Sequence, residues 1–119
     1  MKRSTSLRRG ARGGPMQPAQ LEAVADLFAV LSEPSRLLIL QTLQAGPASV
    51  SQLAAATSLK QANLSKQLGL LLAARLIARR QDGNRAIYSI SLPLVFQLCD
   101  LVCHGVAKRA AEQAQALGA

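Results

Sequence analysis

The feature that most constrains this chain is the order in which the spacing of its apolar residues changes. Apolar residues recur at helical spacing from Pro18 to about Leu31, and the same spacing returns in three later segments. It then gives way to two short runs, residues 76–80 and 85–90, in which apolar and polar residues partly alternate. A helical stripe resumes from Pro93. This order predicts a mainly α-helical domain with one small β-hairpin.

Proline, glycine and capping residues set the boundaries of the second and third helices. Residues 32–34, Ser-Glu-Pro, begin the second helix, and Gly-Pro at 46–47 ends it. Ser49 with Gln52 three residues later has the form of a capping box, in which a hydroxyl and an amide each satisfy a free backbone N–H. We therefore expect a third, short helix from this box to about Thr57.

The fourth helix starts at Ser58 or Lys60, depending on whether a second capping box forms, and we expect it to run to about Leu76. The hairpin turn falls at residues 81–84, because Asp-Gly is a strong hairpin signal. The Ala/Gln-rich stretch after Lys108 indicates fraying of the last helix. The predicted order is α-α-α-α-β-β-α.

The charge balance points to a polyanionic partner. The chain has 14 Lys and Arg against 6 acids, a formal net charge of +8, which suits nucleic acid or an anionic membrane. Residues 1–17 are interpreted as a flexible basic arm and residues 18–117 as one folded domain. The arm lacks the apolar stretch of a signal peptide, and no apolar run is long enough to span a membrane. We expect a cytoplasmic protein with no membrane partner.

The third and fourth helices are short and joined by a tight turn, which presents the fourth helix at a width that fits the DNA major groove. Gln and Asn side chains can pair bidentately with adenine, each good contact being worth about 1–3 kcal/mol of discrimination. A small alanine there can touch a thymine methyl group. The residues expected to meet DNA are Lys60, Gln61, Ala62, Asn63, Ser65, Lys66 and Gln67.

The hairpin adds further basic residues next to this helix. Residues 60–85 hold six Lys and Arg but only one acid, Asp82. On an ordinary hairpin such residues are simply solvated charges. Next to the fourth helix, which is expected to read the bases and is called the reader helix below, they favour contact with a duplex. The hairpin residues expected to contact DNA are Arg79, Arg80, Asn84 and Arg85.

The runs 31–40, 50–53, 61–68 and 76–90 together resemble the arsenical-resistance repressor (ArsR/SmtB) family, over roughly residues 18–110. The resemblance implies a winged helix-turn-helix and a cytoplasmic homodimer paired through its first and last helices. It also implies repression at a two-fold symmetric double-stranded DNA operator until an inducer acts. Gln61, Ser65, Lys66, Gln67 and the wing arginines match the family's reader helix and wing. Gln67 is a departure, because the family often has His there.

Members of that family sense metals, metalloids or oxidants at several places, and two of these are missing here. Ala54 and Ala56 stand where the third-helix site has cysteines, and residues 92–95 lack the Asp and His ligands of the last-helix zinc site. Cys99 and Cys103 remain, four residues apart on one helical face. Two thiolates suit a thiophilic ion such as trivalent arsenic, or can be oxidised, persulfidated or bridged across a dimer.

A packing role for both cysteines stays open, because a buried free Cys behaves as a small apolar side chain. Four-coordinate zinc would need more ligands than two cysteines and His104 supply. No cofactor is required by any motif. No phosphate loop, paired carboxylates or catalytic triad is present, so we expect no enzyme.

Two other functions also stay open. One is a winged helix used for protein contact, which predicts little sequence selectivity on DNA. The other is a constitutive DNA-binding regulator whose cysteines are structural.

Overall fold

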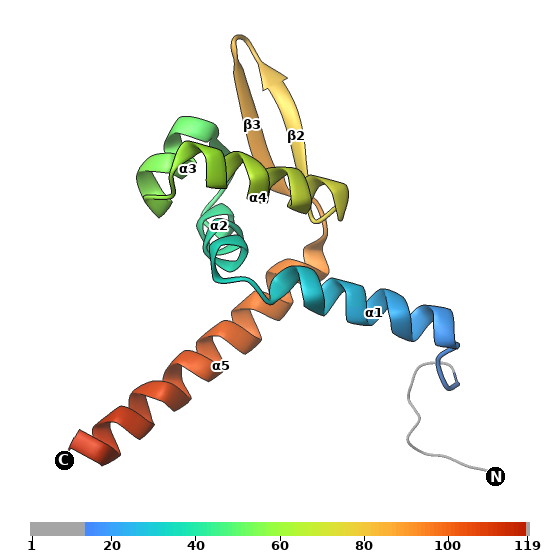
Figure 1. Ribbon diagram of the computed structural model, residues 1–119, viewed down its shortest axis with the longest axis vertical. Helices are drawn as coiled ribbons and strands as arrows, with labels where there is room; N and C mark the ends of the chain where they lie inside the picture. The colour runs from blue at the N-terminus through green and yellow to red at the C-terminus, as the bar shows by residue number, and fades with distance from the viewer. Residues whose placement is uncertain (1–13, 119) are drawn as a thin grey trace.

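Proline stands at the first position of three helices, where its missing N–H and fixed φ suit a helix start. The computed structural model describes residues 14–118. The elements in order are α1 (Pro18–Leu31), α2 (Pro34–Gln44), β1 (Ala48–Ser49), α3 (Val50–Thr57), α4 (Gln61–Ala73), β2 (Ile77–Asp82), β3 (Arg85–Ile90) and α5 (Pro93–Gly118). Figure 1 shows the hairpin β2–β3 projecting beside α4. The predicted order of helices and hairpin is confirmed, and most of the predicted arm, 1–17, lies outside the described residues.

The capping box predicted for α3 is present. The Ser49 hydroxyl accepts from the backbone N–H of Gln52 at 3.2 Å, and the Gln52 Oε1 accepts from the backbone N–H of Ser49 at 2.8 Å. The second box does not form, because Ser58 adopts a left-handed conformation, φ 59°, at the end of α3. Lys60 is instead the N-cap residue of α4.

The fourth helix is shorter than predicted, ending at Ala73 and not at Leu76. Arg75 has φ 63°, and the backbone N–H of Leu76 bonds the carbonyl of Leu71 at 3.1 Å, as in a Schellman motif. This turn directs Leu76 into the core, where it is buried, and leads the chain into β2. The helical spacing of leucines continued past the point where the backbone leaves the helix.

The hairpin is tighter than predicted, and a third strand joins it. The strands extend to Asp82 and from Arg85, so only Gly83 and Asn84 form the turn. The two residues of β1 pair with β3, and the sheet order is β1-β3-β2. A two-residue strand is too short to show an alternating pattern in sequence. The last helix does not fray after Lys108 but continues to Gly118.

Helix α2 lies at the centre of the core and contacts α1, α3, α4, α5 and β3. Large side chains that are fully buried come from α2 itself, from each of the surrounding helices except α1, and from the chain just before β2. They are Ile39, Leu40, Leu53, Leu64, Leu71, Leu76 and Val95. This packing fixes α3 and α4 on one side of α2 and leaves the other side of α4 exposed.

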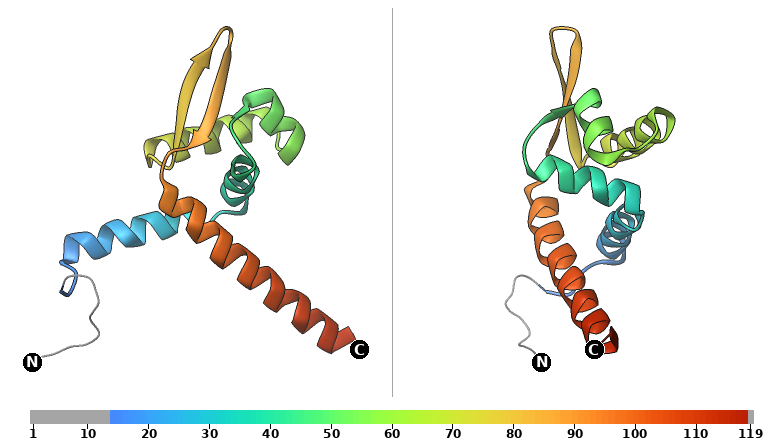
Figure 2. Two further views of the ribbon diagram at one scale, coloured as in Figure 1. Left: turned by 180° about the vertical axis from the view of Figure 1, so that it is seen from behind. Right: turned by 90° about the vertical axis from the view of Figure 1, so that its left-hand side faces the viewer.

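Helices α1 and α5 extend away from this core in different directions (Figure 2). The radius of gyration is 18.0 Å, against about 13 Å for a compact domain of this size. Both extensions carry exposed apolar side chains, including Leu21 and Phe28 on α1 and Leu101 and Val106 on α5. A single copy therefore leaves two apolar helix surfaces uncovered. None of the described helices has the length and apolar character needed to cross a membrane.

Candidate nucleic-acid interface

Most of the predicted reader residues lie on the solvent side of α4. The core side of this helix is formed by Leu64, Leu68 and Leu71. Because these leucines hold one face against α2, the opposite face is directed outward. The residues predicted to meet DNA that are exposed there, or at the helix start, are Lys60, Gln61, Ala62, Ser65 and Lys66.

Gln67 differs from the prediction, because its side chain is only 6% exposed. Its Oε1 accepts from Arg36 Nη1 at 2.9 Å, and its Nε2 donates to Asn63 Oδ1 at 2.8 Å. Gln67 is therefore an internal hydrogen-bonding residue of the interface, and Asn63, half-buried, has part of its amide occupied. The reason is the packing of α4 on α2, which turns position 67 toward the core.

Arg36 is a residue of this site that the sequence analysis missed. It is half-buried in α2, and its Nε donates to the carbonyl of Val30 at the end of α1. It is the only charged residue in α2. A single guanidinium within an apolar helix was the available signal, since a long charged side chain in such a place needs internal partners.

The hairpin β2–β3, called the wing below, presents basic residues on both of its faces. Arg79, Arg80, Asn84 and Arg85 are all exposed, which their predicted contact with DNA requires. Side chains alternate along a strand, so Arg79 and Arg80 lie on opposite faces of the hairpin. The Arg79 guanidinium donates to Gln81 Oε1 at 3.4 Å, and the Gln81 amide donates to the carbonyl of Gly83. These contacts steady the hairpin tip.

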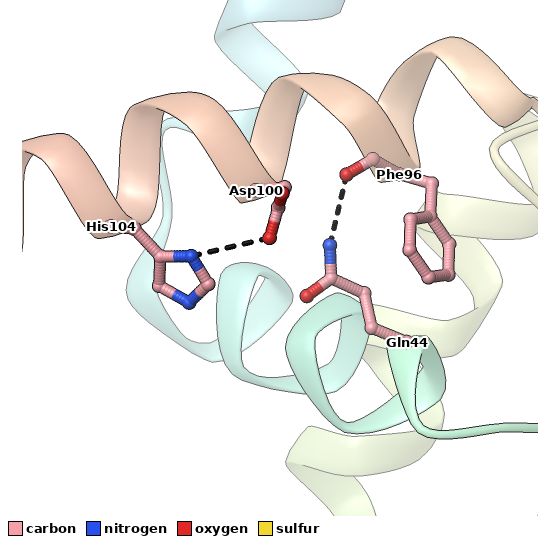
Figure 3. Close-up of polar contacts among 4 residues, drawn as sticks. All are labelled: Gln44, Phe96, Asp100 and His104. Carbon is pink, nitrogen blue, oxygen red and sulfur yellow. Dashed lines mark hydrogen bonds and ion pairs between the residues drawn. The ribbon is translucent and has the colours of Figure 1, made fainter.

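Asp82, opposite Arg85 in the hairpin, is the only acid among residues 60–85, and no ion pair within residues 14–118 joins it to a basic side chain. The one contact between an acidic and a basic side chain found there joins Asp100 Oδ1 and His104 Nδ1 at 3.2 Å on α5 (Figure 3). The exposed side of α4 and the wing therefore keep their positive charges free for phosphates.

Figure 3 also shows the Gln44 amide of α2 donating to the carbonyl of Phe96 at 2.9 Å, a hydrogen bond that joins α5 to the core.

The two cysteines occupy different environments on α5. Cys99 is only 5% exposed and belongs to the hydrophobic core, whereas Cys103 is half-buried at its edge. Burial raises the pKa of the Cys99 thiol above its ordinary value, and the neighbouring Cys103 thiol raises it further. The described residues contain no group of three His, Cys, Asp or Glu side chains placed to hold a metal. One protomer offers a thiol pair only, separate from the exposed His104.

Comparison with known proteins places this geometry in a group of regulators. Residues 31–80 match the model of a helix-turn-helix domain family. An HTH-type transcriptional regulator of Mycobacterium tuberculosis is 41% identical over 75 residues, which cover 62% of this chain. The matched region spans 66% of that regulator's length.

Two solved structures share the fold over most of their length. A homodimeric winged helix-turn-helix DNA-binding domain from Mycobacterium bovis is described as a possible ArsR-family regulator. It is 33% identical, covers 80% of this chain and 87% of its own, and has a TM-score of 0.69. The transcriptional repressor BigR from Xylella fastidiosa is 30% identical and has a TM-score of 0.65. The match covers 73% of this chain and 93% of the BigR chain.

Proposed function

Because the chain belongs to the ArsR/SmtB family of HTH-type transcriptional regulators, which are DNA-binding proteins and not enzymes, we propose that it is a homodimeric repressor released by a thiol-reactive inducer. The observation that carries the DNA-binding part is the exposed face of α4 beside a basic wing, whose Arg79, Arg80 and Arg85 form no ion pair among the described residues. The operator is double-stranded DNA with two related half-sites.

Dimerisation is supported by the apolar surfaces of α1 and α5. Leu21, Phe28 and Val106 are each more than half exposed in one copy, and Leu101 is 75% exposed. Burying a large apolar side chain fully is worth about 1.5–3 kcal/mol, so several such side chains per copy can stabilise a dimer. The similar M. bovis domain is homodimeric. Two copies related by a two-fold axis would present two reader helices to half-sites about one DNA turn apart.

Release by a thiol reagent is supported by the position of the cysteines. Cys103 lies at the accessible edge of the core and is the thiol that a reagent meets first, while Cys99 is packed inside. Trivalent arsenic, as its neutral hydroxide, would form two As–S bonds and lose two hydroxides, which leave as water with the two thiol protons. Drawing Cys99 out of the core to complete that site would disturb the packing of α5 on α2 and β3.

The DNA-binding proposal is tested by footprinting the protein on the DNA upstream of its own gene. We expect protection of one site with two related halves and an affinity that falls steeply as salt rises. Lys66→Gln should weaken this binding, and Lys108→Gln, on the distal part of α5, is the matched control. Uniform protection with no preferred site would overturn the repressor proposal and favour a winged helix that contacts an acidic protein.

The inducer proposal is tested by adding trivalent arsenic, a persulfide donor or a peroxide to the preformed protein–DNA complex. At least one reagent should release the wild-type protein, and Cys103→Ala and Cys99→Ala should blunt that release. Alanine is chosen for Cys99 because a buried hydroxyl would lack a partner. If neither substitution alters any response, the cysteines are structural and the regulator is constitutive with respect to thiol reagents.

A further inference from the structure

Three side chains from two helices form a continuous line of hydrogen bonds that ends at the reader surface. Arg36 of α2 donates through Nε to the carbonyl of Val30 at 2.5 Å, and through Nη1 to Gln67 Oε1 at 2.9 Å. Gln67 of α4 donates through Nε2 to Asn63 Oδ1 at 2.8 Å. The line thus runs from the end of α1 through the core side of α4 to its first turn.

The chemistry of the first member sets the direction of every bond that follows. A guanidinium has donors and no acceptor, so Gln67 has to turn its carbonyl oxygen toward Arg36. Its NH₂ group is then directed at Asn63, which has to meet it with Oδ1. The Asn63 Nδ2, with its two N–H donors, is left on the other side of the amide.

Neither amide can reverse without loss. Reversing Gln67 would set its NH₂ against the donor of Arg36, and reversing Asn63 would set two NH₂ groups against each other. Gln67 is 6% exposed, so water cannot readily replace a lost partner. The Arg36 guanidinium is itself held by two acceptors, the carbonyl of Val30 and the Oε1 of Gln67. The orientation of Asn63 is therefore imposed from inside the protein.

We propose that Arg36 and Gln67 are positioning residues that hold Asn63 as a hydrogen-bond donor toward DNA, so that Asn63 selects a base whose major-groove edge offers acceptors. Guanine fits best, because its N7 and O6 are both acceptors. A bidentate contact with adenine, which the sequence suggested for any Asn here, needs the carbonyl oxygen turned outward as well. This inference rests on the proposed function in one respect, that α4 reads DNA.

The test first selects the preferred operator of the full-length wild-type protein from a pool of randomised duplexes. The base pair under Asn63 is identified as the one whose preference disappears in Asn63→Ala. Affinities are then measured on four duplexes that differ only at that pair. We expect wild type to prefer guanine over cytosine on the contacted strand by about 10-fold.

Three variants separate the direction of the hydrogen bonds from simple packing. Asn63→Asp can still accept from Gln67 but presents an oxygen outward, so preference should reverse toward cytosine, whose N4 is a donor. Gln67→Glu can accept from Arg36 but donates nothing, so the preference should fall to about 2-fold or less. Gln67→His can accept at one ring nitrogen and donate at the other, and should therefore keep the wild-type preference for guanine.

Thermal unfolding and affinity for an unrelated duplex are measured alongside for Gln67→Glu and Gln67→His, and both should be similar in the two variants. If Gln67 had a purely structural role, a loss of guanine preference would be accompanied by a change in these two values. Retention of the guanine preference in Gln67→Glu would overturn the inference, as would a wild-type preference for cytosine. Absence of any preferred operator for wild type would instead refute the proposed function, before a variant is made.

Discussion

The hydroxyl of Ser91 donates to the backbone carbonyl of Arg75 at 3.0 Å, which joins the end of the wing to the turn that follows the reader helix. The backbone N–H of Ser91 also bonds the carbonyl of Leu76 at 3.0 Å. These two bonds fix the angle between α4 and the hairpin. They also hold Arg75 at φ 63°, a left-handed conformation that is unfavourable for a residue with a Cβ.

Arg75→Gly should therefore stabilise the protein. Glycine adopts positive φ without a steric penalty, and this gain in stability is partly offset by the greater conformational freedom of glycine in the unfolded chain. We expect the free energy of unfolding to rise by about 0.5–1 kcal/mol. Urea denaturation at one fixed protein concentration measures it, because the proposed dimerisation would make stability concentration-dependent. Arg75→Ala, which removes the charge but keeps the Cβ, should show no gain, and equal stability of the two variants would contradict the explanation.

The buried thiol of Cys99 should make stability depend on alkaline pH. Its pKa is raised in the folded protein above the ordinary value of 9.0, so the unfolded chain loses this proton at a lower pH than the folded one. Proton loss then favours unfolding, and stability should fall as pH rises above about 9. The difference between wild type and Cys99→Ala, from urea titrations at pH 7 to 10, isolates this contribution. A parallel pH dependence in the two proteins would show that Cys99 does not supply it.

The wing arginines should contribute to DNA affinity through phosphates and not through sequence. Arg79→Gln and Arg80→Gln should each weaken binding to specific and unrelated duplexes alike, and each should reduce the slope of log affinity against log salt by about 1. Because the two side chains lie on opposite faces of the hairpin, the effects should add. Arg109→Gln, in the distal part of α5, is the control and should leave the slope unchanged. If Arg79→Gln and Arg80→Gln also leave the slope unchanged, the wing does not contact DNA.

The apolar side of α5 should hold the dimer together. Leu101 is 75% exposed in one copy, so Leu101→Asp should leave the protomer folded but place a charge in the contact between copies. Sedimentation velocity should then show monomer at concentrations where wild type is dimeric. Ala111→Asp, on the same side of α5 as Asp100 and His104, should remain dimeric. A dimeric Leu101→Asp protein would place the interface elsewhere.

Much of the fold could be predicted from local sequence signals, because those features depend on neighbouring residues. The capping box of Ser49 and Gln52 acts over three residues and is present, and the Asp-Gly signal located the hairpin, whose two turn residues are Gly83 and Asn84. The helical spacing of leucines likewise placed the outward face of α4, including Ser65 and Lys66, by periodicity alone. What failed locally was the end of α4, where apolar spacing continued through a left-handed Arg75.

The sequence by itself thus determined the helix order, the wing, and the exposed, basic character of the reader surface. Only the tertiary structure decided that Gln67 faces inward, that it meets Arg36 from 31 residues away, and that Cys99 is buried while Cys103 stays at the edge. The physical reason is that a side chain's partners depend on how separate helices pack, and no local spacing carries the distance between α2 and α4. The contact between Arg36 and Gln67, which sets the orientation of Asn63, exists only because α4 packs against α2.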